Sequence, residues 1–405
     1  MREVCISKGI YYMGVNDRRK HLFENNWPLP YGVSYNSYLI KDEKSVLIDT
    51  IEYGSNDNYL NHIERILDGA PLDYLVVNHM EPDHSSMIEC VTRRFPDVKV
   101  IGNAQTAKIL KLYFNLPDDS IMIVKDGESL SLGEHTLSFH LIPWVHWPET
   151  MVTYEHTTRT LFSCDAFGGF GTLDGSIFDD ENDFEGHYKA EMLRYYSNIV
   201  GKYSNMVQKA FGKLGGVWYD LQLEGDPVKT ICPSHGLVWR GNPGRVLELY
   251  SKWCNWESER GVVIVYASMY GNTEQMADFI GRILGEKEGI PVKTYDVSKT
   301  HVSYILSDIW KYKGLILGTC AYNTQMHPMM EHLCNEIKLI APKNKTLSIF
   351  GSSTWNGAGV KALAKYAPEM AMEVAGSPLE IMGSATYDKL AQSAEQFVEE
   401  FLKSL

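Results

Sequence analysis

Apolar and polar residues change their spacing along the chain, and the change separates two regions. In the first region, short apolar runs between polar turns predict strands, for example at 35–40 and 45–49. Apolar residues three or four positions apart predict helices between such strands, as at Leu60, Ile63 and Leu67. This region therefore reads as a mixture of short strands and amphipathic helices.

The second region, from Val262 onward, alternates apolar runs with helical periods. The predicted strands are 262–267, 292–295, 315–317, 347–350 and 379–382, and the predicted helices are 274–284, 305–310, 329–340, 360–366 and 390–402. This alternation predicts a doubly wound parallel sheet, and five strands favour the flavodoxin-like order over a six-stranded Rossmann fold. The charged and polar stretch 252–261 separates the regions, so we expect domains at 1–258 and 259–405.

Composition narrows the possible partners. The chain has 405 residues, 44% of them hydrophobic, and a formal net charge of −13. Such an acidic chain does not favour nucleic acid as a partner, because phosphate binding needs a basic face. The first residues lack the apolar segment of a secretory signal, and no apolar run reaches the about 18 residues of a membrane span. We expect a cytoplasmic protein without nucleic-acid or membrane partners.

The cysteines also exclude classes of site. None of the seven forms a Cys-x-x-Cys pair, which argues against a disulfide scaffold or a zinc ribbon. Rubredoxin-type and ferredoxin iron sites need closely spaced thiolates and are not expected either. Electrons that the protein uses would therefore come from another protein or molecule.

Four metal-binding side chains lie directly after the apolar run 74–77. They are His79, Glu81, Asp83 and His84. Two imidazoles and two carboxylates form a mixed nitrogen and oxygen ligand set, which suits iron, manganese or zinc better than Cu(I) or an all-oxygen calcium site. The spacing therefore predicts a metal site at the end of a strand.

Three more candidate ligands follow predicted strands elsewhere in the first region. They are His146, Asp165 and His235. Sites in open α/β folds are built from loops at one edge of the sheets, so we expect these side chains to join the first four. Taken alone, a buried histidine is more often hydrogen-bonded to backbone than bound to a metal, and the shared context is what favours ligation here.

Three loops after strands of the second region predict a flavin site. The loop 268–274 opens a helix with small and hydroxylated residues, which favours a phosphate. It contains neither a P-loop lysine nor Gly-x-Gly-x-x-Gly, so a monophosphate is expected. An ordinary helix cap would explain one such loop, but Tyr322 and Trp355 in the other two could flank a flat ring, as in FMN binding. The expected contacts are Ser268, Met269, Tyr270, Gly271, Asn272, Thr273, Cys320, Ala321, Tyr322, Asn323, Ser352, Ser353, Thr354, Trp355, Asn356 and Gly357.

The order His-x-Glu-x-Asp-His, then His, Asp and His, closely resembles flavodiiron proteins along essentially the whole chain. Metallo-β-lactamase hydrolases usually have a second histidine where Glu81 stands. The resemblance implies an N-terminal αββα metallo-β-lactamase-like domain followed by the flavodoxin-like domain. It further implies the ligand sets His79, Glu81 and His146 for one iron, Asp83, His84 and His235 for the other, and Asp165 as the bridge.

The resemblance also implies two further roles near the irons. Tyr195 looks like a tyrosine that hydrogen-bonds metal-bound ligands, and Trp147 looks like a residue that neighbours the flavin. Cys320, Thr354 and Asn356 depart from the usual flavin loops of the family, which bears on the flavin potential and not on its binding.

Flavodiiron proteins reduce O₂ to water, NO to N₂O, or both, with electrons passing from FMN to a non-haem di-iron site. The resemblance therefore implies an oxidoreductase, with rubredoxin, a flavoprotein reductase or a reduced deazaflavin as electron donor. It also implies a head-to-tail homodimer, or a dimer of such dimers.

Two other functions fit parts of the sequence. One is a dizinc hydrolase of β-lactamase type with an accessory flavodoxin domain, and Glu81 argues against it. The other is a flavodoxin-like electron carrier whose first domain is a binding module, and the complete ligand set argues against that.

Overall fold

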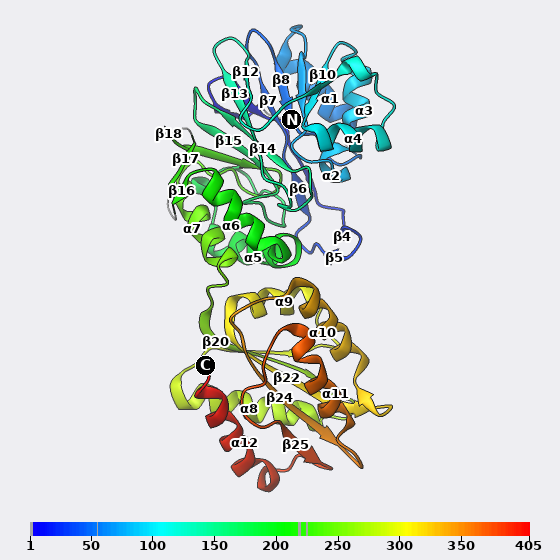
Figure 1. Ribbon diagram of the computed structural model, residues 1–405, viewed down its shortest axis with the longest axis vertical. Coiled ribbons are helices and arrows are strands. Elements are labelled where there is room, and N and C mark those ends of the chain that lie inside the picture. The colour runs from blue at the N-terminus through cyan, green and yellow to red at the C-terminus, as the bar shows by residue number, and fades with distance from the viewer. Residues whose placement is uncertain (1–2, 55, 218–219, 224–225) are drawn as a thin grey trace. The chain divides into compact units, whose positions relative to one another are not determined.

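The chain folds into two compact units, Met1–Cys254 and Asn255–Leu405. The computed structural model describes residues 3–54, 56–217, 220–223 and 226–405. Each unit has its own sheets and helices (Figure 1). Among the described residues, no helix is both long and apolar enough to cross a membrane.

The first unit is built on two large sheets. One has the order β1-β2-β7-β8-β9-β10-β11 and the other β12-β13-β14-β15-β19. Their bounds are β1 (Cys5–Ser7), β2 (Ile10–Tyr12), β7 (Tyr38–Ile40), β8 (Val46–Ile48), β9 (Tyr74–Val76), β10 (Lys99–Gly102), β11 (Ile121–Ile123), β12 (Ser129–Ser131), β13 (Thr136–Leu141), β14 (Met151–Glu155), β15 (Thr160–Cys164) and β19 (Thr230–Pro233). Strands β7, β8, β14 and β15 are buried at every position, so they form the centre of the core.

Helices cover the two sheets on their outer sides, which gives the expected αββα layers. Figure 1 shows α1, α3 and α4 beside the first sheet and α5, α6 and α7 beside the second. The helices of this unit are α1 (Asn56–Leu67), α2 (Pro82–Ser85), α3 (Ile88–Arg94), α4 (Ala104–Tyr113), α5 (Lys189–Tyr195), α6 (Ser204–Lys213) and α7 (Pro243–Cys254). Short strand pairs complete it: β3 (Val15–Asp17) with β6 (Val33–Tyr35), β4 (Leu22–Phe23) with β5 (Trp27–Pro28), and β16 (Gly216–Val217), β17 (Asp220–Leu223) and β18 (Asp226–Pro227) in a third small sheet.

The prediction of one strand over 35–40 is wrong. Strand β6 ends at Tyr35 and β7 begins at Tyr38, so the two belong to different sheets. Between them, the buried Asn36 amide donates hydrogen bonds to the carbonyls of Pro233 and Gly236, each at 2.9 Å. These bonds tie the break to the end of β19 and the loop that follows it, because a buried amide must find its partners inside the protein.

The second unit is the predicted doubly wound sheet. Its parallel strands have the order β21-β20-β22-β24-β25, which is the flavodoxin-like order 2-1-3-4-5. The elements are β20 (Glu259–Ala267), α8 (Asn272–Glu288), β21 (Val292–Asp296), α9 (Val302–Lys311), β22 (Tyr312–Tyr322), β23 (Gln325–Met326), α10 (Pro328–Ile340), β24 (Thr346–Ser353), α11 (Ala358–Tyr366), β25 (Leu379–Met382) and α12 (Tyr387–Leu402). The central strand residues Ile264, Ile316 and Phe350 are fully buried beneath α8 and α12.

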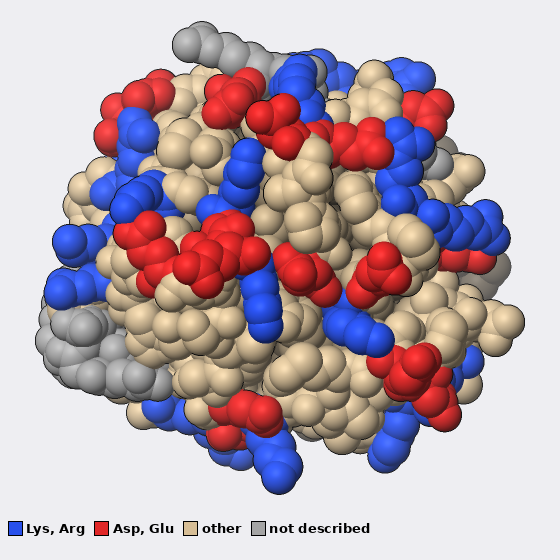
Figure 2. Space-filling view, turned by 90° about the horizontal axis from the view of Figure 1, so that it is seen from above, with Lys and Arg blue, Asp and Glu red and all other residues tan. Residues whose placement is uncertain are grey.

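The described surface carries charges of both signs. On the face of the molecule in Figure 2, lysine and arginine side chains stand among aspartate and glutamate side chains and do not gather into one basic stripe. This distribution agrees with the net charge of −13.

Candidate metal centre

The predicted ligands all lie at strand ends of the first unit. His79 and Glu81 occupy the loop after β9, and Asp83 and His84 lie in the short helix α2, which begins at Pro82. His146 lies in the loop between β13 and β14, while Asp165 and His235 follow β15 and β19. Residues of both sheets therefore reach one place, because the loops at this edge converge.

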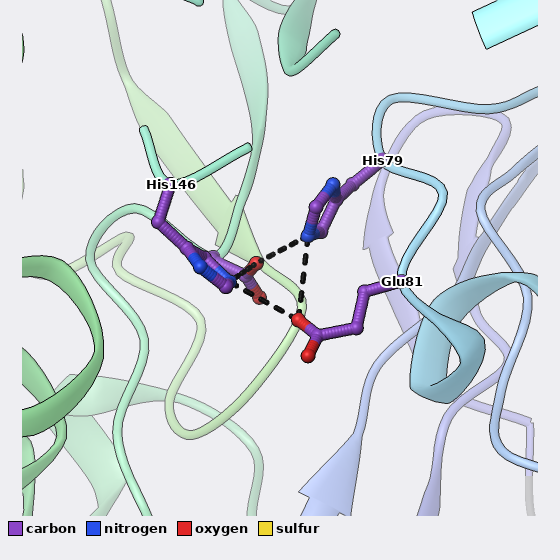
Figure 3. Close-up of side chains that lie close together, drawn as sticks. His79, Glu81 and His146 are labelled. Carbon is purple, nitrogen blue, oxygen red and sulfur yellow. Dashed lines mark hydrogen bonds and ion pairs between the residues drawn. The ribbon is translucent and has the colours of Figure 1, made fainter. Parts of the chain in front are cut away.

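One group of ligands consists of His79, Glu81, His146 and Asp165, all buried. The Nε2 atoms of His79 and His146 lie 3.4 and 3.1 Å from Oε2 of Glu81. Figure 3 shows the two rings and the Glu81 carboxylate directed toward a common point. The ligand atoms of this group lie within 4.8 Å of one another, which is the spacing of a metal site.

A second group consists of Asp83, His84 and His235, also buried and also within 4.8 Å. Nε2 of His84 lies 3.3 Å from Asp83 Oδ1, and Nε2 of His235 lies 3.1 Å from Asp83 Oδ2. The two groups interleave along the sequence and lie next to each other in space.

Asp165 stands between the groups and turns one oxygen to each. Its Oδ2 lies 3.4 Å from Nε2 of both His79 and His146. Its Oδ1 lies 2.9 Å from Nε2 of His84 and 3.6 Å from that of His235. All the ligands expected from the sequence are therefore brought together, with Asp165 in the position of a bridge.

The donor set fits a pair of cations. Within the described part of the chain, both carboxylate oxygens of Asp83, Oδ2 of Asp165 and Nε2 of His235 are buried without a hydrogen-bond partner. Buried charged oxygens are unstable unless a donor or a cation neutralises them. Two metal ions would supply that charge at the points where these atoms converge.

The electrostatics of the metal-free cluster point the same way. Burial lowers the pKa of His79, but the hydrogen bonds that Glu149 and Glu81 accept from its ring, and the charge of Asp165, outweigh burial and raise that pKa to about 10. For His146, the hydrogen bonds and charges of Asp165 and Glu81 likewise outweigh burial and raise the pKa to about 10. The carboxylates of the cluster thus favour positive charge beside them, and protons on His79 and His146 supply it until metals displace them.

Glu149 is a functional residue that the sequence reasoning missed. Its Oε1 accepts a hydrogen bond from Nδ1 of His79 at 2.7 Å, which directs Nε2 of that ring to the cluster. Burial raises the pKa of Glu149, but the hydrogen bond and charge of His79 outweigh it, so the pKa lies below its usual value and the group is a carboxylate. The available signal was an acidic residue in the same loop as His146. Such a carboxylate partner is typical of metal-binding histidines.

Aromatic rings wall the second group. Phe23 packs edge-on against the rings of His235 and Phe170, with centroids 5.4 Å apart in both pairs. Tyr195 lies 5.6 Å from His235 and 5.1 Å from Phe170. Its hydroxyl is buried and has no hydrogen-bond partner among the residues that the structure describes. The rings give the surroundings of His235 an apolar wall, and the Tyr195 hydroxyl is available to donate to a bound group.

Trp147, expected near a flavin, lies in the first unit directly after His146. Its ring stands perpendicular to that of His79, with centroids 5.1 Å apart. It therefore supports the first group of ligands.

The expected flavin contacts of the second unit converge on one groove at the strand ends. The groove has a volume of 180 Å³ and is lined by Ser268, Met269, Tyr270, Asn272, Thr273, Cys320, Ala321, Ser352, Ser353, Thr354, Trp355 and Asn356. Gly271 precedes α8 at φ +90°, a conformation that favours glycine, and its N–H donates to Oγ of Ser268. Thr273 and Ser352 join the first and third loops through a 2.8 Å hydroxyl hydrogen bond. Of the other expected contacts, Tyr322 ends β22 and is 40% exposed, Asn323 follows it, and Gly357 precedes α11.

Comparisons with known proteins cover both units. A family model described as ODP family beta lactamase matches residues 33–236, and a flavodoxin model matches residues 264–397. The anaerobic nitric oxide reductase flavorubredoxin of Escherichia coli O1:K1 is 32% identical over 374 residues, which cover 92% of this chain and 76% of that protein.

Solved structures match over nearly the entire length. Rubredoxin oxygen:oxidoreductase from the anaerobe Desulfovibrio gigas has a TM-score of 0.90 at 28% identity, covering 100% of this chain and 99% of that one. A flavoprotein from Thermotoga maritima has a TM-score of 0.88 at 29% identity, covering 99% and 98%.

Proposed function

This chain belongs to the flavodiiron protein family, and we propose that it is an oxidoreductase that reduces O₂ to water, NO to N₂O, or both. The observation that carries the proposal is the double ligand group that shares Asp165. Relatives named as nitric oxide reductase and as rubredoxin oxygen:oxidoreductase support both gases as substrates.

His79, Glu81 and His146 would hold one iron, Asp83, His84 and His235 the other, and Asp165 would bridge the two. When bound, the irons supply open coordination positions for a diatomic gas and the electrons that reduce it. Three carboxylates offset part of the metal charge, and four imidazoles complete the set.

The chain's own residues prepare this site. Glu149 keeps a proton on Nδ1 of His79, so that Nε2 is free to bind metal. Phe23 and Phe170 keep the neighbourhood of His235 dry. Tyr195 would donate its unpartnered hydroxyl hydrogen to a bound gas molecule, which favours the charge that builds up on reduction.

FMN would bind at the groove of the second unit and deliver the electrons. The phosphate would lie at the N-terminus of α8, where backbone N–H groups and the helix dipole favour an anion. The exposed rings of Tyr322 and Trp355 would flank the flavin. We further propose a head-to-tail homodimer, in which FMN of one subunit serves the irons of the other, and rubredoxin, a flavoprotein reductase or a reduced deazaflavin as the donor.

The hydrolase alternative is disfavoured. Relatives over nearly the whole chain are oxidoreductases by name, and Glu81 gives the first ligand group an anionic oxygen that favours a redox metal over zinc.

The deciding experiment measures consumption of O₂ and of NO by the same anaerobically purified protein, loaded with iron and FMN, under one saturating reductant. Faster turnover of O₂ identifies an oxygen reductase, and faster turnover of NO identifies a nitric oxide reductase. Turnover of neither gas by protein with full iron and FMN content would contradict the proposal.

The dimer has its own test. A subunit that lacks iron through Asp165→Ala is mixed and refolded with a subunit that lacks FMN. A head-to-tail dimer pairs intact FMN of the first with intact irons of the second, so activity returns. If each subunit served its own irons, the mixture would stay inactive.

A further inference from the structure

The histidines of the two ligand groups differ in the partner of their second ring nitrogen. Nδ1 of His79 donates to the carboxylate of Glu149, and Nδ1 of His235 donates to the backbone carbonyl of Ser34, both at 2.7 Å. Both rings are fully buried. The two hydrogen bonds therefore match in length and burial and differ in charge: an anion supports the first group and a neutral carbonyl supports the second.

Glu149 is held so that it cannot turn away. Its Oε1 also accepts the backbone N–H of Met80 at 2.9 Å, and its own carbonyl accepts the side-chain amide of Asn103 at 2.5 Å. Asn103 is in turn the N-cap of α4. Glu149 is only 1% exposed, and no described residue forms a hydrogen bond with its Oε2. Water does not screen its charge, so that charge acts on His79.

The loop that holds Glu149 also carries His146. Its turn is closed by hydrogen bonds from the N–H of Trp144 to the carbonyl of Trp147, at 2.7 Å, and from the N–H of Ile142 to the carbonyl of Thr150, at 3.0 Å. One loop thus supplies a ligand of the first group and the anionic partner of another ligand in that group. No carboxylate is hydrogen-bonded to Nδ1 of a second-group histidine among the described residues.

We propose that Glu149 makes the two metal positions unequal, so that the iron held by His79, Glu81 and His146 is the first to be oxidised. This inference rests on the proposed function. A carboxylate on Nδ1 gives the imidazole partial anionic character, which strengthens Nε2 as a ligand and favours the ferric state. Glu149 is a positioning and tuning residue, since it acts on the metal through His79.

The redox step involves one electron. In a potentiometric titration, the first iron passes from ferrous to ferric as one electron leaves for ferricyanide, and dithionite returns it. Glu149 exchanges no electron, and the proton on Nδ1 of His79 stays in place throughout.

The test compares Glu149→Gln with Glu155→Gln in the full-length protein loaded with iron. Glutamine keeps the shape and the acceptor oxygen of Glu149 and removes its charge. Glu155 is a matched control: it is also fully buried, lies on the neighbouring strand β14, and accepts backbone hydrogen bonds from Thr157 and Thr158 without touching a ligand. Midpoint potentials and the Mössbauer spectrum of the half-oxidised protein are measured for each.

We expect Glu149→Gln to keep both irons at saturating iron, with about 10- to 100-fold weaker affinity. Its first oxidation moves to a higher potential, and the gap between the two one-electron steps narrows, because both groups then have neutral partners. Glu155→Gln keeps the wild-type potentials, and Glu149→Asp, which restores the charge, moves them back toward wild type.

Unchanged potentials in Glu149→Gln would overturn the inference. So would loss of iron at saturation, which would make Glu149 a structural requirement and not a tuning residue, or a Glu149→Asp potential as shifted as that of the glutamine variant. If the wild-type protein itself shows no iron-based steps, the proposed function fails, and the inference with it.

Discussion

The two units prepare for their cofactors in opposite ways. The centre of the first unit consists of buried titratable side chains, with His79 and His235 at 0% exposure and Asp165 at 1%. The groove of the second unit is lined by backbone and small hydroxylated side chains, and its aromatic rims are open, with Tyr270 at 91% and Trp355 at 79% exposure. The buried carboxylates of the first unit need a cation or a proton beside them, whereas the hydroxyls of Thr273 and Ser352 in the second unit bond to each other without a ligand.

Substitution of Asp165 should have the largest effect, and it should affect the first unit alone. We expect Asp165→Ala to abolish iron binding and gas reduction while FMN stays bound at the wild-type ratio, because Asp165 contacts both ligand groups and lies in the first unit. Iron and flavin contents and turnover are measured together. Asp174→Ala is the control, since that carboxylate is 57% exposed and pairs with Arg18. Normal turnover by Asp165→Ala would refute the bridge.

Removal of metal should destabilise the first unit alone. At a free iron concentration a thousand times the dissociation constant, bound metal contributes about 4 kcal/mol to the free energy of unfolding. Calorimetry of chelated and iron-loaded protein should therefore show a changed unfolding temperature for the first unit. The unfolding temperature of the second unit, which flavin fluorescence identifies, should stay the same. Equal shifts of both transitions would mean that the units do not respond separately.

A negative charge placed in the loop before α8 should weaken FMN binding and leave iron binding unchanged. We expect Ser268→Asp to weaken FMN binding about tenfold or more, or about 1.4 kcal/mol, because it sets a carboxylate beside the expected phosphate. Iron content should stay at the wild-type level. Ser268→Asn is the neutral control, and equilibrium dialysis of FMN measures the difference. Equal affinity of the two variants would place the phosphate elsewhere.

Removal of the Tyr195 hydroxyl tests whether this group takes part in gas reduction at the metal centre. Tyr195→Phe removes a buried hydroxyl that bonds to none of the described residues, so the free energy of unfolding should stay the same or rise. If the hydroxyl donates to a bound gas molecule, turnover falls about tenfold, the worth of one such hydrogen bond. Turnover is compared at full iron content, with Tyr196→Phe, whose hydroxyl bonds Ser204, as control. Unchanged turnover would leave Tyr195 with packing alone.

The last expected effect is on stability alone and concerns a buried amine of the second unit. Burial, and to a lesser extent Lys313, lowers the pKa of Lys345 to about 7. The unfolded chain therefore binds more protons than the folded one between pH 7 and the usual lysine pKa near 10.4, and the stability due to Lys345 rises with pH across that window. We expect the stability of wild type relative to Lys345→Met to increase from pH 7 to pH 9 in urea unfolding. A difference that is independent of pH would show that the amine stays charged.

The fold was easier to predict in the second unit than in the first. Buried parallel strands are continuous apolar runs, so the strands that become β20, β21, β22, β24 and β25 stand out in the sequence. In the first unit many strands have only two or three residues, such as β4 and β5. Two residues contain no hydrophobic period, so the hairpin that carries Phe23 could not be predicted.

The sequence by itself determined the kinds and order of the candidate ligands, because they stand in a local pattern at the ends of apolar strands. The bridging place of Asp165 was already implied by the family resemblance. Only the tertiary structure decided two pairings: that of His79 with Glu149, and that of His235 with the carbonyl of Ser34. The two pairs are 70 and 201 residues apart. A hydrogen bond across such a distance exists only once the sheets have packed and brought the loops to one edge, and no local spacing encodes that meeting.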